Sequence, residues 1–230
     1  MITEFKIYLK QGNKKVGYDY PQLLHGLVCD LAGDNRYGSI VSNYTYSNLH
    51  GEKRFADGID FDDKKTYFTI RVNEENMSQV FKNIADGFKK KHGKDLFYGM
   101  RLDGIEINTC SEFTRNHFRT MLESPIKINV KTNGKEFNKK FFLDADDIAE
   151  TEEYLKKNIL KKARAHRFDA DKDLSIKIRK QGRPRTVYYR GLLCNGRVFD
   201  LDIRCDEKTK EFIMLHGVGC GNGIGFGMIY

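Results

Sequence analysis

The stretch Gly217–Gly227 reads GVGCGNGIGFG, with a glycine at every second position near the C-terminal end of the sequence. Such a run forms neither an ordinary helix nor an ordinary strand, because each glycine raises the entropic cost of an ordered backbone. Glycine permits a positive φ and the close approach of another backbone, and exposed amide groups in such a loop can cradle phosphate oxygens. We therefore expect a tight loop that either packs against the chain or contacts a phosphate.

The spacing of these glycines excludes the common nucleotide-binding loops. A G-x-G-x-x-G motif that starts at Gly217 would need glycine where Asn222 stands, and one that starts at Gly219 would need glycine where Ile224 stands. Only three residues follow Gly227, so the sequence offers no helix whose N-terminus could receive a pyrophosphate. The Walker pattern fails as well, because no Lys-Ser or Lys-Thr pair follows the glycines.

The first half of the sequence predicts strands and helices in a known order. Apolar residues alternate with polar ones in Ile2–Lys10, and Pro21 stands where a helix commonly begins. The predicted elements are a strand Ile2–Lys10, a helix Pro21–Gly33, strands Asn43–Leu49 and Thr66–Val72, a helix Asn76–Lys91 and a strand region Leu96–Ile107. This β-α-β-β-α-β order is that of a ferredoxin-like unit.

A similar order recurs in the second half, with an added hairpin. The predicted elements are a strand Ile126–Lys131, a helix Asp146–Arg167, strands Leu174–Arg179 and Thr186–Leu193 around a turn at Gly182-Arg183-Pro184, a strand Arg197–Arg204, a helix Lys208–Leu215 and a strand Ile224–Ile229. We therefore predict an α+β fold of two tandem ferredoxin-like (RRM-like) units, residues 1–110 and 111–230, the second of which carries the glycine-rich loop.

Charge and composition indicate which kinds of partner and site the chain can have. The 230 residues carry a net charge of +8, of which +1 belongs to residues 1–108 and +7 to residues 109–230. This excess suggests a polyanionic partner for the second half, although lysine-rich faces can also serve solubility alone. Five cysteines without a C-x-x-C pair suggest neither a disulfide framework nor a zinc site, so we expect no metal ion. Without a signal peptide or a membrane-spanning apolar run, we expect a cytoplasmic protein and no membrane partner.

A basic stretch in the second half is a candidate nucleic-acid surface. Its cationic side chains, with no acidic residue among them, are Lys177, Arg179, Lys180, Arg183, Arg185 and Arg190. Along one ribbon they can neutralise successive phosphates, while Tyr188 and Tyr189 can stack an unpaired base. An RNA stem-loop suits such a ribbon, because duplex RNA is recognised by shape and backbone. The alternative is an ordinary solvated face.

The glycine spacing G-h-G-x5-G-h-G resembles the C-terminal loop of the CRISPR-associated repeat-processing endoribonucleases, which belong to the RAMP superfamily. Tyr188-Tyr189-Arg190-Gly191 resembles the strand pair that precedes this loop, and Asn43–Leu49 resembles the family's aromatic-Ser strand. The resemblance implies binding of precursor CRISPR repeat RNA and metal-independent cleavage by 2′-hydroxyl attack, with a 2′,3′-cyclic phosphate product. It also implies RNA contacts by Gly217, Gly219, Gly225 and Gly227, and it implies no cofactor.

Such cleavage needs a general acid and a general base, and histidine is the natural proton carrier near neutral pH. In the resembled family the catalytic histidine usually lies in the first helix or just after it. His25 is therefore the first candidate, although it can equally be a packed helix residue. Tyr20 and Tyr37 are candidate assistants, and His50 is the second candidate. His216, next to the glycine-rich loop, is a candidate phosphate contact.

Two other readings of the sequence stay open. The chain can be a non-catalytic RAMP subunit that holds RNA in a CRISPR effector complex, which needs the loop and the basic stretch but no proton carrier. It can also be an unrelated α+β interaction module with a fortuitous glycine run. Effector-complex subunits and a second copy of the chain, as a homodimer, are further candidate partners.

Overall fold

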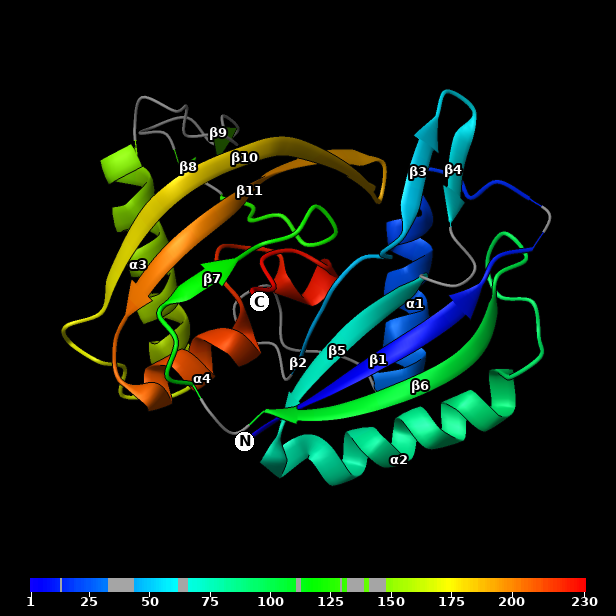
Figure 1. Cartoon of the computed structure of the whole chain (residues 1–230), viewed down its shortest axis with the longest axis horizontal. Coiled ribbons are helices and arrows are strands. Elements are labelled where there is room, and N and C mark those ends of the chain that lie inside the picture. The colour runs from blue at the N-terminus through cyan, green and yellow to red at the C-terminus, as the bar shows by residue number, and fades with distance from the viewer. Residues whose placement is uncertain are drawn as a thin grey trace.

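The computed structural model describes residues 1–12, 14–32, 44–61, 66–110, 113–128, 130–131, 139–140 and 148–230. Two sheet-and-helix units lie side by side, one from each half of the chain, and the C-terminal residues end between them (Figure 1). Among the described residues, no helix is long and apolar enough to cross a membrane.

The first unit is the ferredoxin-like arrangement that the sequence predicts. Its elements are β1 (Ile2–Lys10), α1 (Tyr20–Ala32), β2 (Tyr44–Tyr46), β5 (Tyr67–Asn73), α2 (Glu74–Lys91) and β6 (Arg101–Cys110). The sheet order is β2-β5-β1-β6, with every neighbouring pair antiparallel. Long alternating strands place β1 at the centre, where Phe5 pairs with Ile70 on one side and with Ile107 on the other.

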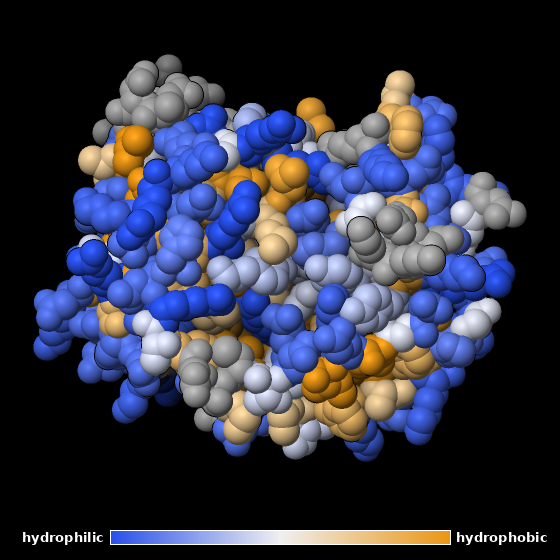
Figure 2. Space-filling view, in the orientation of Figure 1, coloured by the Kyte–Doolittle hydropathy of each residue, from blue (hydrophilic) through white to orange (hydrophobic). Residues whose placement is uncertain are grey.

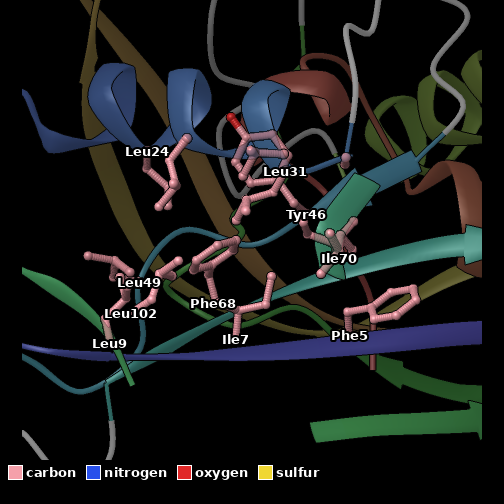
Figure 3. Close-up of a cluster of buried hydrophobic side chains, with 14 of the residues drawn as sticks. Phe5, Ile7, Leu9, Leu24, Leu31, Tyr46, Leu49, Phe68, Ile70 and Leu102 are labelled. Atoms are coloured by element: carbon pink, nitrogen blue, oxygen red, sulfur yellow. The ribbon is translucent and has the colours of Figure 1, made fainter. Parts of the chain in front are cut away.

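The core of this unit lies between the sheet and α1. Figure 3 shows Leu24 and Leu31 of α1 above Ile7 of β1 and Phe68 of β5. All four side chains are fully buried, and burial of a Leu, Ile or Phe side chain is worth about 1.5–3 kcal/mol. The helical spacing of Val80, Phe81 and Ile84 in the sequence predicts that all three point inward from α2, but Phe81 is 47% exposed.

A hairpin that the sequence analysis did not predict is inserted between β2 and β5. It consists of β3 (Glu52–Phe55) and β4 (Gly58–Phe61), and it projects from the sheet (Figure 1). An antiparallel bridge between Val16 and Ile59 ties it to the segment before α1.

The second unit contains β7 (His117–Arg119), β8 (Val130–Lys131), β9 (Lys139–Lys140), α3 (Ile148–Ala165), β10 (Ser175–Tyr189), β11 (Leu192–Arg204), α4 (Glu207–His216) and a 3-10 turn, η2 (Asn222–Ile224). Its main sheet has the order β10-β11-β7. Reciprocal backbone hydrogen bonds of 2.9 Å between Arg119 and Tyr230 place the C-terminal residues on the other side of β7. The order of the first unit is thereby repeated.

Three expectations for this unit are wrong. The turn expected at Gly182-Arg183-Pro184 does not exist: β10 runs through it with a register shift, and the chain turns at Arg190-Gly191. The opening strand is β7, whereas Ile126 and Lys127 only bridge to Arg197 and Cys220. No regular strand forms over Ile224–Ile229, where Ile229 makes a single bridge to Thr120.

Candidate functional site

The glycine-rich loop folds back on itself where the two units meet. Val218 donates its backbone N–H to the carbonyl of Gly227 at 2.8 Å, and Gly227 donates to Pro125 at 3.0 Å. Cys220 donates to the carbonyl of Lys127 at 2.7 Å. These bonds close the ends of the loop and attach it to the segment after β7.

Close packing explains why glycine occupies the four positions singled out in the sequence. Gly217, Gly219, Gly225 and Gly227 all have φ between +68° and +88° and are buried. A Cβ on Gly227 would lie 1.9 Å from the carbonyl oxygen of Val218, and one on Gly219 would lie 2.6 Å from that of Lys127. In this conformation the open side of these glycines faces other protein atoms, so the loop is an architectural element whatever it contacts besides.

A buried lysine forms hydrogen bonds with the glycine-rich loop. Lys162 of α3 donates from Nζ to the carbonyls of His216 and Gly217 at 3.1 and 2.8 Å, and to Oδ1 of Asn222 at 2.6 Å. Burial lowers the pKa of Lys162 to about 7. Lys162 was not predicted from the sequence, although its place on the apolar face of α3, seven residues after Leu155, was an available signal.

Polar contacts across the junction join the two units. Asn48, just after β2, donates from Nδ2 to the carbonyls of Glu123 at 2.8 Å and Gly225 at 3.2 Å. Arg185 of β10 forms an ion pair with Glu52 of β3, with Nη2 at 2.7 Å from Oε2, and both side chains are about nine-tenths buried. The glycine-rich loop and the basic strand are therefore held against the first unit.

His25 lies at this same junction. Its half-buried side chain projects from α1, and Nδ1 is 3.2 Å from the hydroxyl of Tyr46 in β2. The ring of Tyr189 in β10 meets it edge-on, with centroids 5.8 Å apart, and the thiol of Cys29 lies 3.7 Å from Nε2. The imidazole thus lies outside the two main apolar clusters and contacts side chains from both units.

Tyr46 forms a hydrogen bond with His25 whose donor depends on the tautomer of the imidazole. Burial raises the pKa of the Tyr46 phenol well above 10, so this group keeps its proton near neutral pH. Tyr46 and Tyr189 were not predicted as partners of His25, because they come from strands far apart in the sequence.

The other expected catalytic residues lie in different surroundings. Tyr20 is buried in the core of the first unit and packs edge-on against Phe61 at 5.7 Å. Tyr37 lies outside the described residues. His50 is buried, stacks on Tyr67 at 4.2 Å, and lies 3.2 Å from the Ser47 hydroxyl through Nε2.

Burial makes His50 unsuited to proton exchange near neutral pH, and it keeps His216 away from solvent. Desolvation, with the nearby charge of Lys6, lowers the pKa of His50 to about 4. His216 is 8% exposed and packs against His166 and Phe212, with ring centroids 3.9 and 4.4 Å away. Among the candidate histidines of the sequence analysis, His25 is therefore the one whose imidazole is only half-buried.

The basic stretch is less uniformly cationic than its sequence implies. Lys177 pairs with Glu152 of α3 at 2.8 Å, and Arg179 pairs with Asp202 of the neighbouring strand at 3.1 Å. Arg185 is neutralised by Glu52 as described, and the Arg190 guanidinium lies 5.5 Å from the centre of the Tyr189 ring. The exposed Lys180 and Arg183 form no ion pair within the described part of the chain.

The surface around this stretch remains strongly polar. Figure 2 shows mainly hydrophilic side chains over α3 and the adjoining part of β10. Within the residues that the structure covers, no three His, Cys, Asp or Glu side chains are grouped so as to hold a metal ion.

Two ferredoxin-like units with a C-terminal glycine-rich loop packed where they meet are the arrangement that the resemblance in the sequence implies. The profile of the family "CRISPR associated protein Cas6, C-terminal" matches residues 105–230, more than half of the sequence. The chain therefore belongs to the Cas6 family, whose members are endoribonucleases that process CRISPR repeat RNA.

Solved structures share this fold over the whole chain. The product of a Cas6-related gene from Pyrococcus furiosus has a TM-score of 0.80 at 20% identity, with 100% of this chain and 98% of that chain covered. An RAMP protein that binds different RNA substrates gives 0.76 at 19% identity, with the same coverage. Thermus thermophilus Cse3, bound to an RNA that represents a pre-cleavage complex, gives 0.54 at 12% identity, again with 100% and 98% covered. No curated protein sequence matches the chain.

Proposed function

We propose that this protein binds precursor CRISPR repeat RNA and cleaves it within the repeat, without a metal ion, by attack of a 2′-hydroxyl on the adjacent phosphate. The products are a 2′,3′-cyclic phosphate and a 5′-hydroxyl. The observation that carries the proposal is the position of His25, whose half-buried imidazole contacts Tyr46 of one unit and Tyr189 of the other. A proton carrier at the junction is placed where an RNA strand can lie against both units.

In this proposal His25 moves the proton. It either takes the proton from the attacking 2′-hydroxyl or gives one to the leaving 5′-oxygen, and such positioned proton transfer contributes about 10²–10⁴-fold to a rate. Tyr46 orients the ring through its contact with Nδ1. Tyr20 and His50 are buried, so we assign the proton transfer to His25 alone among them.

Arg190 is the cation that we assign to the phosphate. It follows Tyr189, whose ring contacts His25, and its backbone N–H donates to the Gln22 side chain of α1 at 3.2 Å. The exposed guanidinium is thus held beside the helix that carries His25. A positive charge at this point stabilises the negative charge that develops on the phosphate oxygens during attack.

The exposed Lys180 and Arg183 extend this cationic surface along β10, where they can neutralise further phosphates. Lys177 and Arg179 can add to it, because ion pairs that are mostly exposed are weak and exchange partners readily. The glycine-rich loop stabilises the junction of the two units. We propose the repeat RNA as the main partner, and effector-complex subunits or a second copy of the chain as further ones.

The test is cleavage of an end-labelled CRISPR repeat RNA by the purified protein in EDTA. We expect one cut, a product that ends in a cyclic phosphate, and no cut when a single deoxy substitution removes the 2′-hydroxyl at the cleaved position. Tight binding without any cut would instead indicate a scaffold subunit of an effector complex. A cut that survives the deoxy substitution, or that EDTA abolishes, would contradict the proposed chemistry.

A further inference from the structure

A cavity of about 260 Å³ lies between the start of α1 and the β10–β11 hairpin. We call it the junction cavity. Tyr18, Tyr20 and Pro21 line it from the first unit, and the residues from the second unit include Arg185, Tyr188 and Leu193. Its walls are mostly apolar. Drug-sized ligands usually occupy sites of roughly 300–1,000 Å³, so this cavity has room for something smaller, such as a single ring system.

Arg185 contributes a nearly buried guanidinium to the wall of the junction cavity. It is 8% exposed, and its ion pair with Glu52 uses the terminal nitrogens of the guanidinium. The Nε–H is fully buried, so a ligand in the cavity does not reach it.

Charge indicates which kind of ligand fits the cavity. Glu52 already neutralises the guanidinium of Arg185, so this residue adds no net positive charge to the cavity. A phosphate would gain little from such a site. A neutral, planar ring fits the polarity better, and nucleobases have this character.

Two aromatic side chains offer surfaces on which such a base can stack. Tyr18 and Tyr188, on opposite sides of the junction, are 41% and 38% exposed, so part of each ring is open to solvent. Bases stack on such rings irrespective of their sequence. We infer that the junction cavity takes one unpaired nucleobase of the RNA, which stacks on Tyr188.

This inference rests on the proposed function and adds cut-site selection to it. Pro21 precedes His25 by four residues of α1, which is about 6 Å along the helix axis. On the other side, Tyr188 of the cavity is followed by Tyr189, which contacts His25. A nucleotide with its base in the junction cavity therefore has its own backbone near His25. The captured base thus decides which phosphate is presented for cleavage.

The experiment combines an abasic scan of the repeat RNA with variants of the hairpin. Binding is measured for substrates that lack one base at a time, with the wild-type protein, Tyr188→Ala, Tyr188→Phe and Leu192→Ala. Leu192 is the matched control, because it lies on the same hairpin, is 67% exposed and does not line the cavity. Thermal unfolding of each variant checks that the hairpin is intact.

We expect Tyr188→Ala to weaken binding of the intact RNA by about tenfold, which corresponds to one lost stacked base. Tyr188→Phe, which keeps a ring, and Leu192→Ala should bind within about twofold of the wild type. Removal of one particular base, next to the cut, should weaken wild-type binding by a similar factor but should have no further effect on Tyr188→Ala. In that abasic substrate the wild-type cut should lose its precision.

Two results would overturn the inference. The first is a Tyr188→Ala variant that binds like the wild type. The second is weaker binding by Tyr188→Ala whose effect adds to every abasic substitution, which would mean that the RNA backbone or the protein itself fills the cavity. Both are distinguishable from failure of the proposed function, since in that case the wild-type protein would not cut the intact repeat at all.

Discussion

Replacement of Gly227 by alanine should destabilise the protein far more than a glycine substitution usually does. The new Cβ would lie 1.9 Å from the Val218 carbonyl oxygen, and the residue has φ +70°, where alanine costs roughly 1–2 kcal/mol. The backbone must move to relieve the contact. That movement strains the Val218–Gly227 and Gly227–Pro125 hydrogen bonds, each worth about 1 kcal/mol. We therefore expect a loss of about 3–4 kcal/mol.

Gly93 provides the matched control. It also has a positive φ, +73°, but a Cβ there would meet nothing within 4 Å, so Gly93→Ala tests the backbone conformation without the contact. In a chain of this size about 1 kcal/mol shifts Tm by roughly 2–4 °C. Thermal unfolding should therefore show a decrease of about 10 °C for Gly227→Ala and of about 3 °C for Gly93→Ala. Equal decreases in the two variants would refute the argument that close packing requires glycine in the loop.

Three further predictions concern buried polar groups. Lys162→Met should lower the free energy of unfolding in urea by about 2–4 kcal/mol, because three oxygens lose their donor, and an unchanged midpoint would contradict the role of this lysine in holding the loop. In the folded protein the pKa of His50 is about 4, below its ordinary 6.5, so the protein should lose about 3 kcal/mol of stability as pH falls from 6.5 to 4. The variant His50→Phe should flatten this pH dependence. A pH profile of stability that runs parallel to that of the wild type would count against the role of His50. Arg185→Met should lower the free energy of unfolding by about 3–5 kcal/mol, because it leaves Glu52 buried and unpaired. A second change, Glu52→Gln, should recover part of this loss. Strictly additive losses in this double-mutant cycle would show that the two residues do not interact.

Periodicity predicted the long elements of the fold, and tertiary pairing decided the short ones. The alternation in Ile2–Lys10 and the helical spacing before Lys91 gave β1 and most of α2, because each buries a continuous face. The three residues of β7 carry too short a pattern to stand out, although they form a strand of the second sheet, next to β11. Pro184 suggested a turn, but a register shift in the ladder of β10 and β11 accommodates it within the strand.

Part of the candidate site could be predicted from the sequence. His25 could be selected because the resembled family usually carries its catalytic histidine in the first helix or just after it, and the structure places His25 at the junction of the units. Its contacts with Tyr46 and Tyr189 could not be derived, since they depend on how two separate sheets meet. The acidic partners of the basic stretch were hidden for the same reason, because Glu52, Glu152 and Asp202 all lie outside it in sequence.

The most direct test of the central proposal is the single-turnover rate at which His25→Ala cleaves a CRISPR repeat RNA, compared with the wild-type rate, with RNA affinity measured on the same samples. If His25 carries the proton, the rate should fall by about 10²–10⁴-fold while the affinity stays within a few-fold of the wild type. Cleavage by His25→Ala at the wild-type rate would contradict the assignment, and the proton carrier would then have to be sought elsewhere in the chain.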